Sequence, residues 1–226
     1  MAESKANPGR ALAVLRKMFA WMFEPRVLVV DVEQDRQSAL DKGLKAYSDG
    51  RFADAVSLFR KAAEKGHPVA EHMLGVCFYD GDGVERNDAE AAKWFRKAAE
   101  QGFAKAQYML GDFHESGRGS LEQDYVEAEK WYRQAAEQGL DRAQNSLGWF
   151  YCNGFGVKKD PVEAVKWYRL AAEQGFDEAQ YNLGVAYLEG SGIEKDRAEA
   201  AKWFRMAADQ GMEDAEKMIK MNGLGS

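Results

Sequence analysis

The side chains of this sequence that could carry out chemistry are few. Among its 226 residues there are three histidines and two cysteines. The sequence repeats with a period of 36 or 37 residues, and each repeat unit is expected to hold two helices. His72 and His114 fall on the first helix of two successive units, at positions six residues apart within the unit. Six residues of α-helix rise by about 9 Å, and the distance between two units adds to this. These two histidines cannot share a zinc ion, and we expect no metal site.

No group of residues indicates nucleophilic catalysis or phosphate binding. Ser146 and Asp141 have no histidine in their own unit, and the chain contains no Gly-x-Ser-x-Gly motif. Gly-x-Gly turns recur, but they lack the preceding strand and third glycine of a dinucleotide site. The Asp-Gly-Asp-Gly stretch at 80–83 is too short for a calcium loop. The sequence therefore predicts a protein that is not an enzyme, with no catalytic residues and no cofactor.

The composition excludes further classes of function. The chain has a formal net charge of −6, a pI of about 5.3 and 46% hydrophobic residues. Because binding to phosphate backbones needs a basic surface, we expect no nucleic-acid partner. Two cysteines cannot build a disulfide framework, and the length is sufficient for a packed core.

The elements that position these side chains repeat with a fixed period. One tryptophan and two glycines recur every 36 or 37 residues, which is the signature of a stacked repeat array. The recurring residues are Trp94, Trp131, Trp167 and Trp203; Gly75, Gly111, Gly148 and Gly184; and Gly102, Gly139, Gly175 and Gly211. One unit carries a single extra residue between Gly119 and Asp124, where a loop can absorb it.

Each unit is predicted to form a pair of helices. The first carries alanine and Leu-Gly at fixed spacing, which lets a neighbouring helix approach closely, and it ends at a Gly-x-Gly turn. The second begins with Asn or Asp followed three residues later by Glu, a capping box, and it ends before Gln-Gly. Because the four tryptophans occupy one position within the unit, we expect them to fill the core between the helices.

The two ends of the array differ from its middle. We expect a shorter inter-helix loop in the first unit and a charged half-unit, with Lys220 in place of the glycine, as a terminal cap. The predicted organisation is an N-terminal segment at 1–36 followed by a solenoid at 37–223. Its parts are the units 37–68, 69–104, 105–141, 142–177 and 178–211 and a capping helix at 212–223.

Residues 69–211 resemble the Sel1-like repeat family, the long-loop relatives of tetratricopeptide repeats. The resemblance rests on four tandem copies of Ala-x-x-x-Leu-Gly, a Gly-x-Gly turn, and a second helix that ends in Ala-Ala-Glu/Asp-Gln-Gly. It implies an all-α fold, a right-handed α-solenoid of antiparallel helix hairpins, that binds other proteins as a scaffold or adaptor and catalyses no particular reaction.

The residues that vary between units on the inner face of such a stack are the candidate partner-binding residues. By helical spacing, they lie three before, one after and four after the glycine of each first helix. Trp149 is notable because fold maintenance already uses another tryptophan in its unit. The alternative is that some of these rings pack against the following unit. The candidates are His72, Tyr79, Tyr108, Asp112, Glu115, Asn145, Trp149, Cys152, Tyr181 and Leu188.

The N-terminal segment suggests a second function. Residues 10–23 are predicted to form a basic amphipathic helix that either lies on a membrane surface or covers the first repeat. Arg16 and Lys17 interrupt the apolar stretch, so no cleavable signal peptide is evident. We expect a cytoplasmic scaffold for a protein or peptide, with a membrane-associated adaptor at the periphery of the inner membrane as the alternative. The sequence leaves the oligomeric state open.

Overall fold

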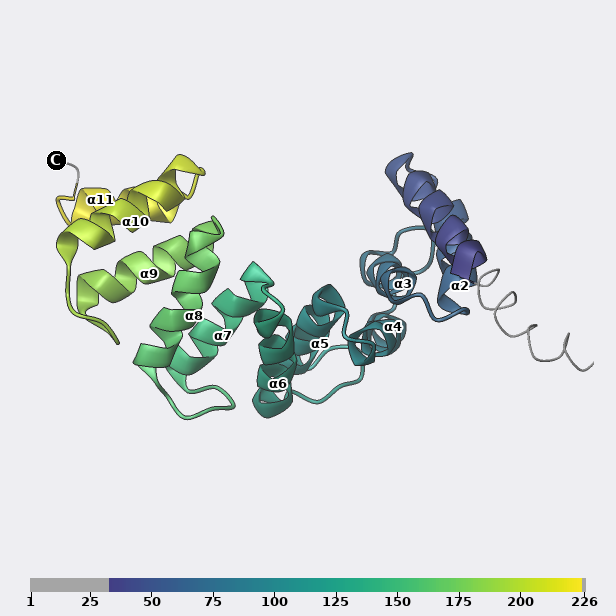
Figure 1. Ribbon diagram of the computed structural model, residues 1–226, viewed down its shortest axis with the longest axis horizontal. Helices are drawn as coiled ribbons and strands as arrows, with labels where there is room; N and C mark the ends of the chain where they lie inside the picture. Colours follow the sequence, from purple (N-terminus) through teal and green to yellow (C-terminus); the bar gives the residue numbers. More distant parts are fainter. Residues whose placement is uncertain (1–32, 225–226) are drawn as a thin grey trace, which may run out of the picture.

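The computed structural model describes residues 33–224, and this part of the chain folds into consecutive helices joined by short loops (Figure 1). The predicted all-α solenoid is confirmed, because each helix packs mainly against its neighbours along the chain. After a helix over 33–48 come α2 (Phe52–Ala63), α3 (Pro68–Asp80), α4 (Asp88–Glu100), α5 (Ala104–Ser116), α6 (Tyr125–Glu137), α7 (Asp141–Asn153), α8 (Pro161–Glu173), α9 (Asp177–Glu189), α10 (Arg197–Asp209) and α11 (Glu213–Met221).

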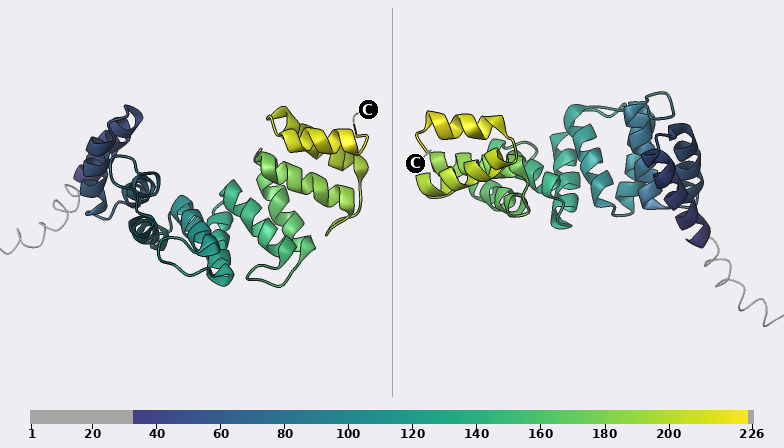
Figure 2. Two further views of the ribbon diagram at one scale, coloured as in Figure 1. Left: turned by 180° about the vertical axis from the view of Figure 1, so that it is seen from behind. Right: turned by 90° about the horizontal axis from the view of Figure 1, so that it is seen from above.

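The helix pairs are arranged along an arch. Both ends of the described chain, the helix over 33–48 and α10 with α11, rise on the same side of the arch (Figure 1). The view from behind in Figure 2 shows the same curvature. Among the described residues, no helix combines the length and apolar character required to cross a bilayer.

The start of the second helix in each of the four long units, α4, α6, α8 and α10, is fixed by one side chain and one backbone bond. The carboxylate of Asp124 accepts from the N–H groups of Val126 and Glu127 at 2.9 and 3.0 Å. The N–H of Asp124 donates to the carbonyl of His114 on α5 at 2.9 Å. The glutamate of the predicted capping box instead accepts from a lysine three residues later, as Lys130 and Glu127 do at 2.5 Å. The first half of the capping box is thus confirmed, and the backbone of the first helix replaces the second half.

A glycine and an aromatic ring interlock between the two helices of each unit. A Cβ added at Gly75 would lie 2.5 Å from the ring of Phe95, and the other units repeat this arrangement. The close approach predicted from the Leu-Gly pattern is therefore confirmed. The rings in question, which are almost fully buried, are Phe59, Phe95, Tyr132, Tyr168 and Phe204.

The prediction that the repeated tryptophans fill the core is wrong for three of the four. Trp203 is buried, whereas Trp94, Trp131 and Trp167 are half-buried and cover the edges of the apolar clusters. The fully buried position is the next residue along the chain. Successive residues of an α-helix point in directions about 100° apart, so only one of the two faces the core directly. Because the tryptophan and the aromatic residue after it recur with the same period, the spacing in the sequence does not show which of them is buried.

The second glycine of each Gly-x-Gly turn joins one unit to the unit before it. Gly156 has φ of +65° and lies so close to the backbone of Tyr125, at the start of α6, that a side chain has no room. Gly83, Gly119 and Gly192 pack in the same way against the unit before them. The turns therefore serve the stacking of units. The extra residue that follows the second Gly-x-Gly turn is absorbed in the loop before Asp124, where Ser120 adopts φ of +66°.

Buried glutamines form a second inter-unit feature. Gln107 is 3% exposed; its amide donates to the carbonyl of Ala99 in the preceding unit at 3.2 Å and accepts from Gln138 at 2.6 Å. Gln144 and Gln180 make the same two bonds in their units. In the unit of α3 and α4 the matching residue is Glu71, which accepts from Gln101 at 2.5 Å.

The two ends of the array differ from its middle in the structure. Only residues 49–51 separate the helix over 33–48 from α2, against 81–87 in the next unit, as the shorter first loop predicted. α11 lies within the segment 212–223, whose role as a terminal cap stays a prediction. The described part of the first helix already includes residues 33–36, which the sequence assigned to the N-terminal segment 1–36. The amphipathic helix predicted at 10–23 lies outside the described residues, and both of its interpretations stay predictions.

Candidate functional site

The ten candidate residues all lie on the first helices of their units, α3, α5, α7 and α9. Nine of them keep part of their surface accessible to solvent. Trp149 on α7 is 40% exposed, although indole is a large apolar group whose exposure to water is unfavourable. The other units carry smaller residues at its position: Val76, Asp112 and Val185.

A hollow of about 300 Å³ brings five candidate residues together between α5, α7 and α9. We call it the acidic hollow. Two carboxylates and three aromatic side chains border it, together with amide and hydroxyl groups. Its lining consists of Tyr108, Asp112, Glu115, Tyr132, Asn145, Ser146, Trp149 and Asn182.

The carboxylates of the acidic hollow are held by few groups. The hydroxyl of Tyr132 donates to Glu115 at 2.6 Å. Asp112 has Arg118 at 3.7 Å, an ion-pair distance that is too long for a hydrogen bond. Burial raises the pKa of Asp112, and the pKa of Glu115 is raised chiefly by burial as well, because water solvates both charges incompletely.

The other wall of the acidic hollow is fixed by neighbouring polar groups. The amide of Asn182 on α9 donates to the side-chain oxygen of Asn145 on α7 at 2.9 Å. The ring of Tyr108 lies with its centroid 5.6 Å from that of Tyr132. The residues that line the hollow come from three units, so the hollow exists only in the stacked array.

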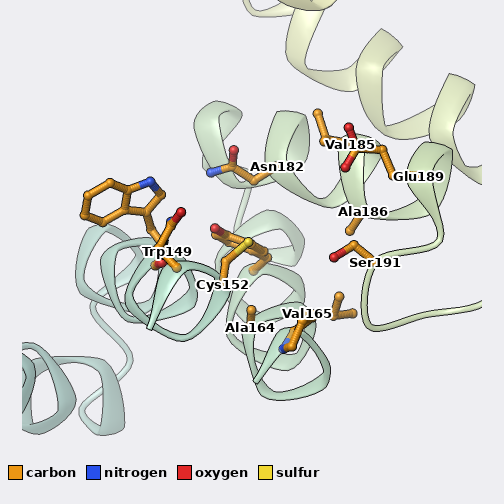
Figure 3. A pocket seen from close by; sticks show the side chains of 12 residues that line it. Trp149, Cys152, Ala164, Val165, Asn182, Val185, Ala186, Glu189 and Ser191 are labelled. Atoms are coloured by element: carbon orange, nitrogen blue, oxygen red, sulfur yellow. Dashed lines mark hydrogen bonds between the residues drawn. The ribbon is translucent and has the colours of Figure 1, made fainter. Parts of the chain in front are cut away.

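Trp149 and Asn182 line both the acidic hollow and a second hollow of about 250 Å³, which lies among α7, α8 and α9 and is mainly apolar (Figure 3). The indole stands at the edge of the group, and Cys152 lies nearer the middle (Figure 3). The ring centroid of Trp149 is 4.7 Å from that of Phe155. The ring of Phe155 in turn stacks on Tyr125 at a centroid distance of 4.9 Å. One face of Trp149 is thus supported from inside while the side chain stays accessible.

The remaining candidates lie outside these two hollows. The hydroxyl of Tyr79 accepts from Arg118 at 2.7 Å and its ring contacts Phe113, so Tyr79 packs on the following unit, as the alternative interpretation expected. Tyr181 packs on Phe204, and Leu188 packs on the C-terminal core.

His72 is placed differently from the expectation of an open position. It is 9% exposed and packs between the rings of Phe95 and Phe103, at centroid distances of 5.5 and 5.2 Å. Burial lowers the pKa of His72 to about 4, so the ring is neutral at physiological pH. His72 is thus more enclosed than an open position would be, because its ring fits between Phe95 and Phe103, although it still borders a hollow with Tyr108 and Arg142. A role of His72 in partner binding stays a prediction.

Three residues of the acidic hollow were missed from the sequence. Tyr132 occupies the core position held by phenylalanine in α4, and its hydroxyl was the available signal. Ser146 and Asn182 lie two residues before the glycine of their helices, where the preceding units carry Met73 and Met109. The change from methionine to polar residues at this position could have indicated the site. The prediction considered only the positions three before, one after and four after the glycine, and so it left this position out.

Comparison with known proteins supports the repeat fold. A model of the Sel1 repeat matches residues 46–67, 68–103, 104–140, 141–176 and 177–212. A solved Sel1 repeat protein from Oxalobacter formigenes is 38% identical with a TM-score of 0.72, covering 78% of this chain and 72% of that chain. The protein c5321, a protective antigen of uropathogenic Escherichia coli with an SLR fold, is 37% identical with a TM-score of 0.77. That match covers 84% of this chain and 42% of the antigen.

Among curated proteins, an exopolysaccharide production negative regulator of Rhizobium leguminosarum bv. viciae is 46% identical over 48 residues. The match covers 21% of this chain and 18% of the regulator. The chain thus spans about a fifth of that relative and less than half of the antigen. The repeat match, in contrast, runs through nearly the whole described array, and the chain belongs to the Sel1 repeat family.

Proposed function

We propose that this chain is a non-catalytic scaffold that binds a peptide or protein partner, with Trp149 as the central anchor. The binding surface is the accessible side of the first helices α3, α5, α7 and α9, which we call the open face. Sel1 repeat proteins generally mediate protein–protein interactions. The observation that carries the proposal is the exposure of Trp149 between two hollows, supported from behind by Phe155. Tryptophan is enriched among the residues that dominate binding energies.

A selection from a displayed random-peptide library against the full chain tests the proposal. We expect enriched peptides to bind Trp149→Ala roughly tenfold or more weakly, because an anchor residue contributes at least about 1.4 kcal/mol. Leu170→Ala is the matched control. Leu170 is 46% exposed but lies on the second helix α8, away from the two hollows, so this variant should bind as the unaltered chain does.

Thermal melts of both variants show whether the fold is retained. Enriched peptides that bind Trp149→Ala and the unaltered chain equally, while Leu170→Ala weakens them, would place the binding surface on the second helices and contradict the proposal.

A further inference from the structure

We propose that the acidic hollow is a subsite for a guanidinium group, so that the partner presents an arginine side chain to α5 and α7. This inference rests on the proposed function and specifies what the open face recognises.

The charge of the open face supports a cationic group. Asp112 and Glu115 are three residues apart on α5 and border one hollow, and Glu189 borders the neighbouring one. In the described part of the chain, neither hollow is lined by a lysine or an arginine. Charge complementarity across an interface favours partners of opposite sign.

The existing contacts leave the carboxylates available to a partner. Arg118 stays 3.7 Å from Asp112 and donates to the hydroxyl of Tyr79 at 2.7 Å. Tyr132 uses one donor to hold Glu115 in place. A carboxylate oxygen accepts more than one hydrogen bond, so both carboxylates retain acceptor capacity toward the hollow.

The shape and the rings favour arginine over lysine. A guanidinium is planar, presents several donors to carboxylates and amide oxygens, and stacks on aromatic faces. Trp149 and Tyr108 supply such faces, and the Asn145–Asn182 pair supplies amide groups, at the border of the same hollow. Lysine, a compact and strongly hydrated charge, would use the rings less fully.

The direct test uses N-acetyl-arginine N-methylamide as the probe and the neutral isostere N-acetyl-citrulline N-methylamide as its control. Titration of the full chain is followed by the NMR signal of the Trp149 indole N–H, identified by its loss in Trp149→Phe. We expect saturable shifts with the arginine probe and at least fivefold weaker binding of the citrulline probe. The lysine analogue should bind at least threefold more weakly than arginine.

Two variants test the carboxylates. Asp112→Asn and Glu115→Gln together should weaken the arginine probe at least fivefold, whereas Glu189→Gln, the same type of change in the neighbouring hollow, should alter it less than twofold. Circular dichroism melts verify that each variant is folded. Equal binding of arginine and citrulline probes, or equal weakening by Glu189→Gln, would overturn the assignment.

Peptides selected in the preceding experiment separate the two proposals. Peptides that depend on Trp149 but tolerate replacement of each arginine by citrulline would overturn the guanidinium subsite and leave the scaffold function standing. Peptides that lose at least fivefold in affinity on one such replacement, and only with Asp112 and Glu115 intact, would support both.

Discussion

At the scale of single residues, the inter-unit contacts depend on whether a buried side chain can donate as well as accept. Gln107, Gln144 and Gln180 do both, since each donates to a carbonyl of the preceding unit and accepts from a glutamine of its own unit. Glu71, 4% exposed, occupies the same position with a carboxylate that accepts only when ionised. Burial raises the pKa of Glu71, and Lys97 and the bond from Gln101 oppose the shift.

Glu71→Gln should therefore stabilise the protein at pH 7. We expect a gain of about 0.5–1.5 kcal/mol in the free energy of unfolding, because glutamine restores the missing donor and removes the cost of a buried charge. The pKa of Glu71 in the folded protein lies above 4.5, its value in the unfolded chain. The contribution of Glu71 to the free energy of unfolding is therefore fully present below pH 4.5, and it is lost as the pH rises through the folded pKa.

Urea denaturation at pH 4 and pH 7 measures both effects. The advantage of Glu71→Gln should be larger at pH 7 than at pH 4. Glu173→Gln, an exposed change of the same type on α8, serves as the control. An advantage for Glu71→Gln that is equal at both pH values would show that burial of the charge is not its cause.

At the scale of the elements, two kinds of glycine perform different tasks. Those after the second helices, such as Gly139 with φ of +89°, end a helix and have open space around the position of a Cβ. Those that close the Gly-x-Gly turns, such as Gly156, combine a positive φ with close backbone packing on the previous unit. The first kind is a requirement of local conformation, and the second is a requirement of stacking.

Gly139→Ala and Gly156→Ala form a matched pair that separates these requirements. Gly139→Ala should cost about 1–2 kcal/mol, the conformational penalty of an L-residue at positive φ. Gly156→Ala should cost at least about 2 kcal/mol more, because its Cβ forces α6 and the turn apart. Thermal and urea unfolding give both values, and equal costs would mean that the turn yields without disturbing the stack.

At the scale of the whole molecule, the arch is a chain of local contacts. Each helix packs mainly on its neighbours in sequence. A change in the stability of one unit therefore affects a distant unit only through the units between them. In such arrays stability is approximately a sum over units and their interfaces. The acidic hollow, which is lined by residues of three units, therefore depends on the middle of the array.

Phe59→Ala tests this locality. Phe59 is fully buried in α2 at the N-terminal end, and its loss should cost about 3–5 kcal/mol there. We expect faster hydrogen exchange in the helix over 33–48, α2 and α3, and unchanged protection in α8, α9 and α10. Hydrogen-exchange mass spectrometry measures this, and uniform acceleration along the chain would show that the array unfolds as one cooperative unit.

Much of this architecture can be predicted from the sequence because its signals are local and repeated. The caps at Asn87, Asp124, Asp160 and Asp196 and the turn glycines each act over a few residues, and four copies reinforce one another. The candidate site was predicted in part: Asp112, Glu115 and Trp149 do border one hollow, whereas His72 is enclosed.

The sequence alone determined the helix pairs, the period and the family, since these follow from hydrogen bonding and turn conformation within each unit. Only the tertiary structure decided which ring of each Trp-aromatic pair is fully buried and which first-helix residues share a hollow. These outcomes depend on how units rotate against one another, and that rotation is set by packing between residues some 36 positions apart in the chain.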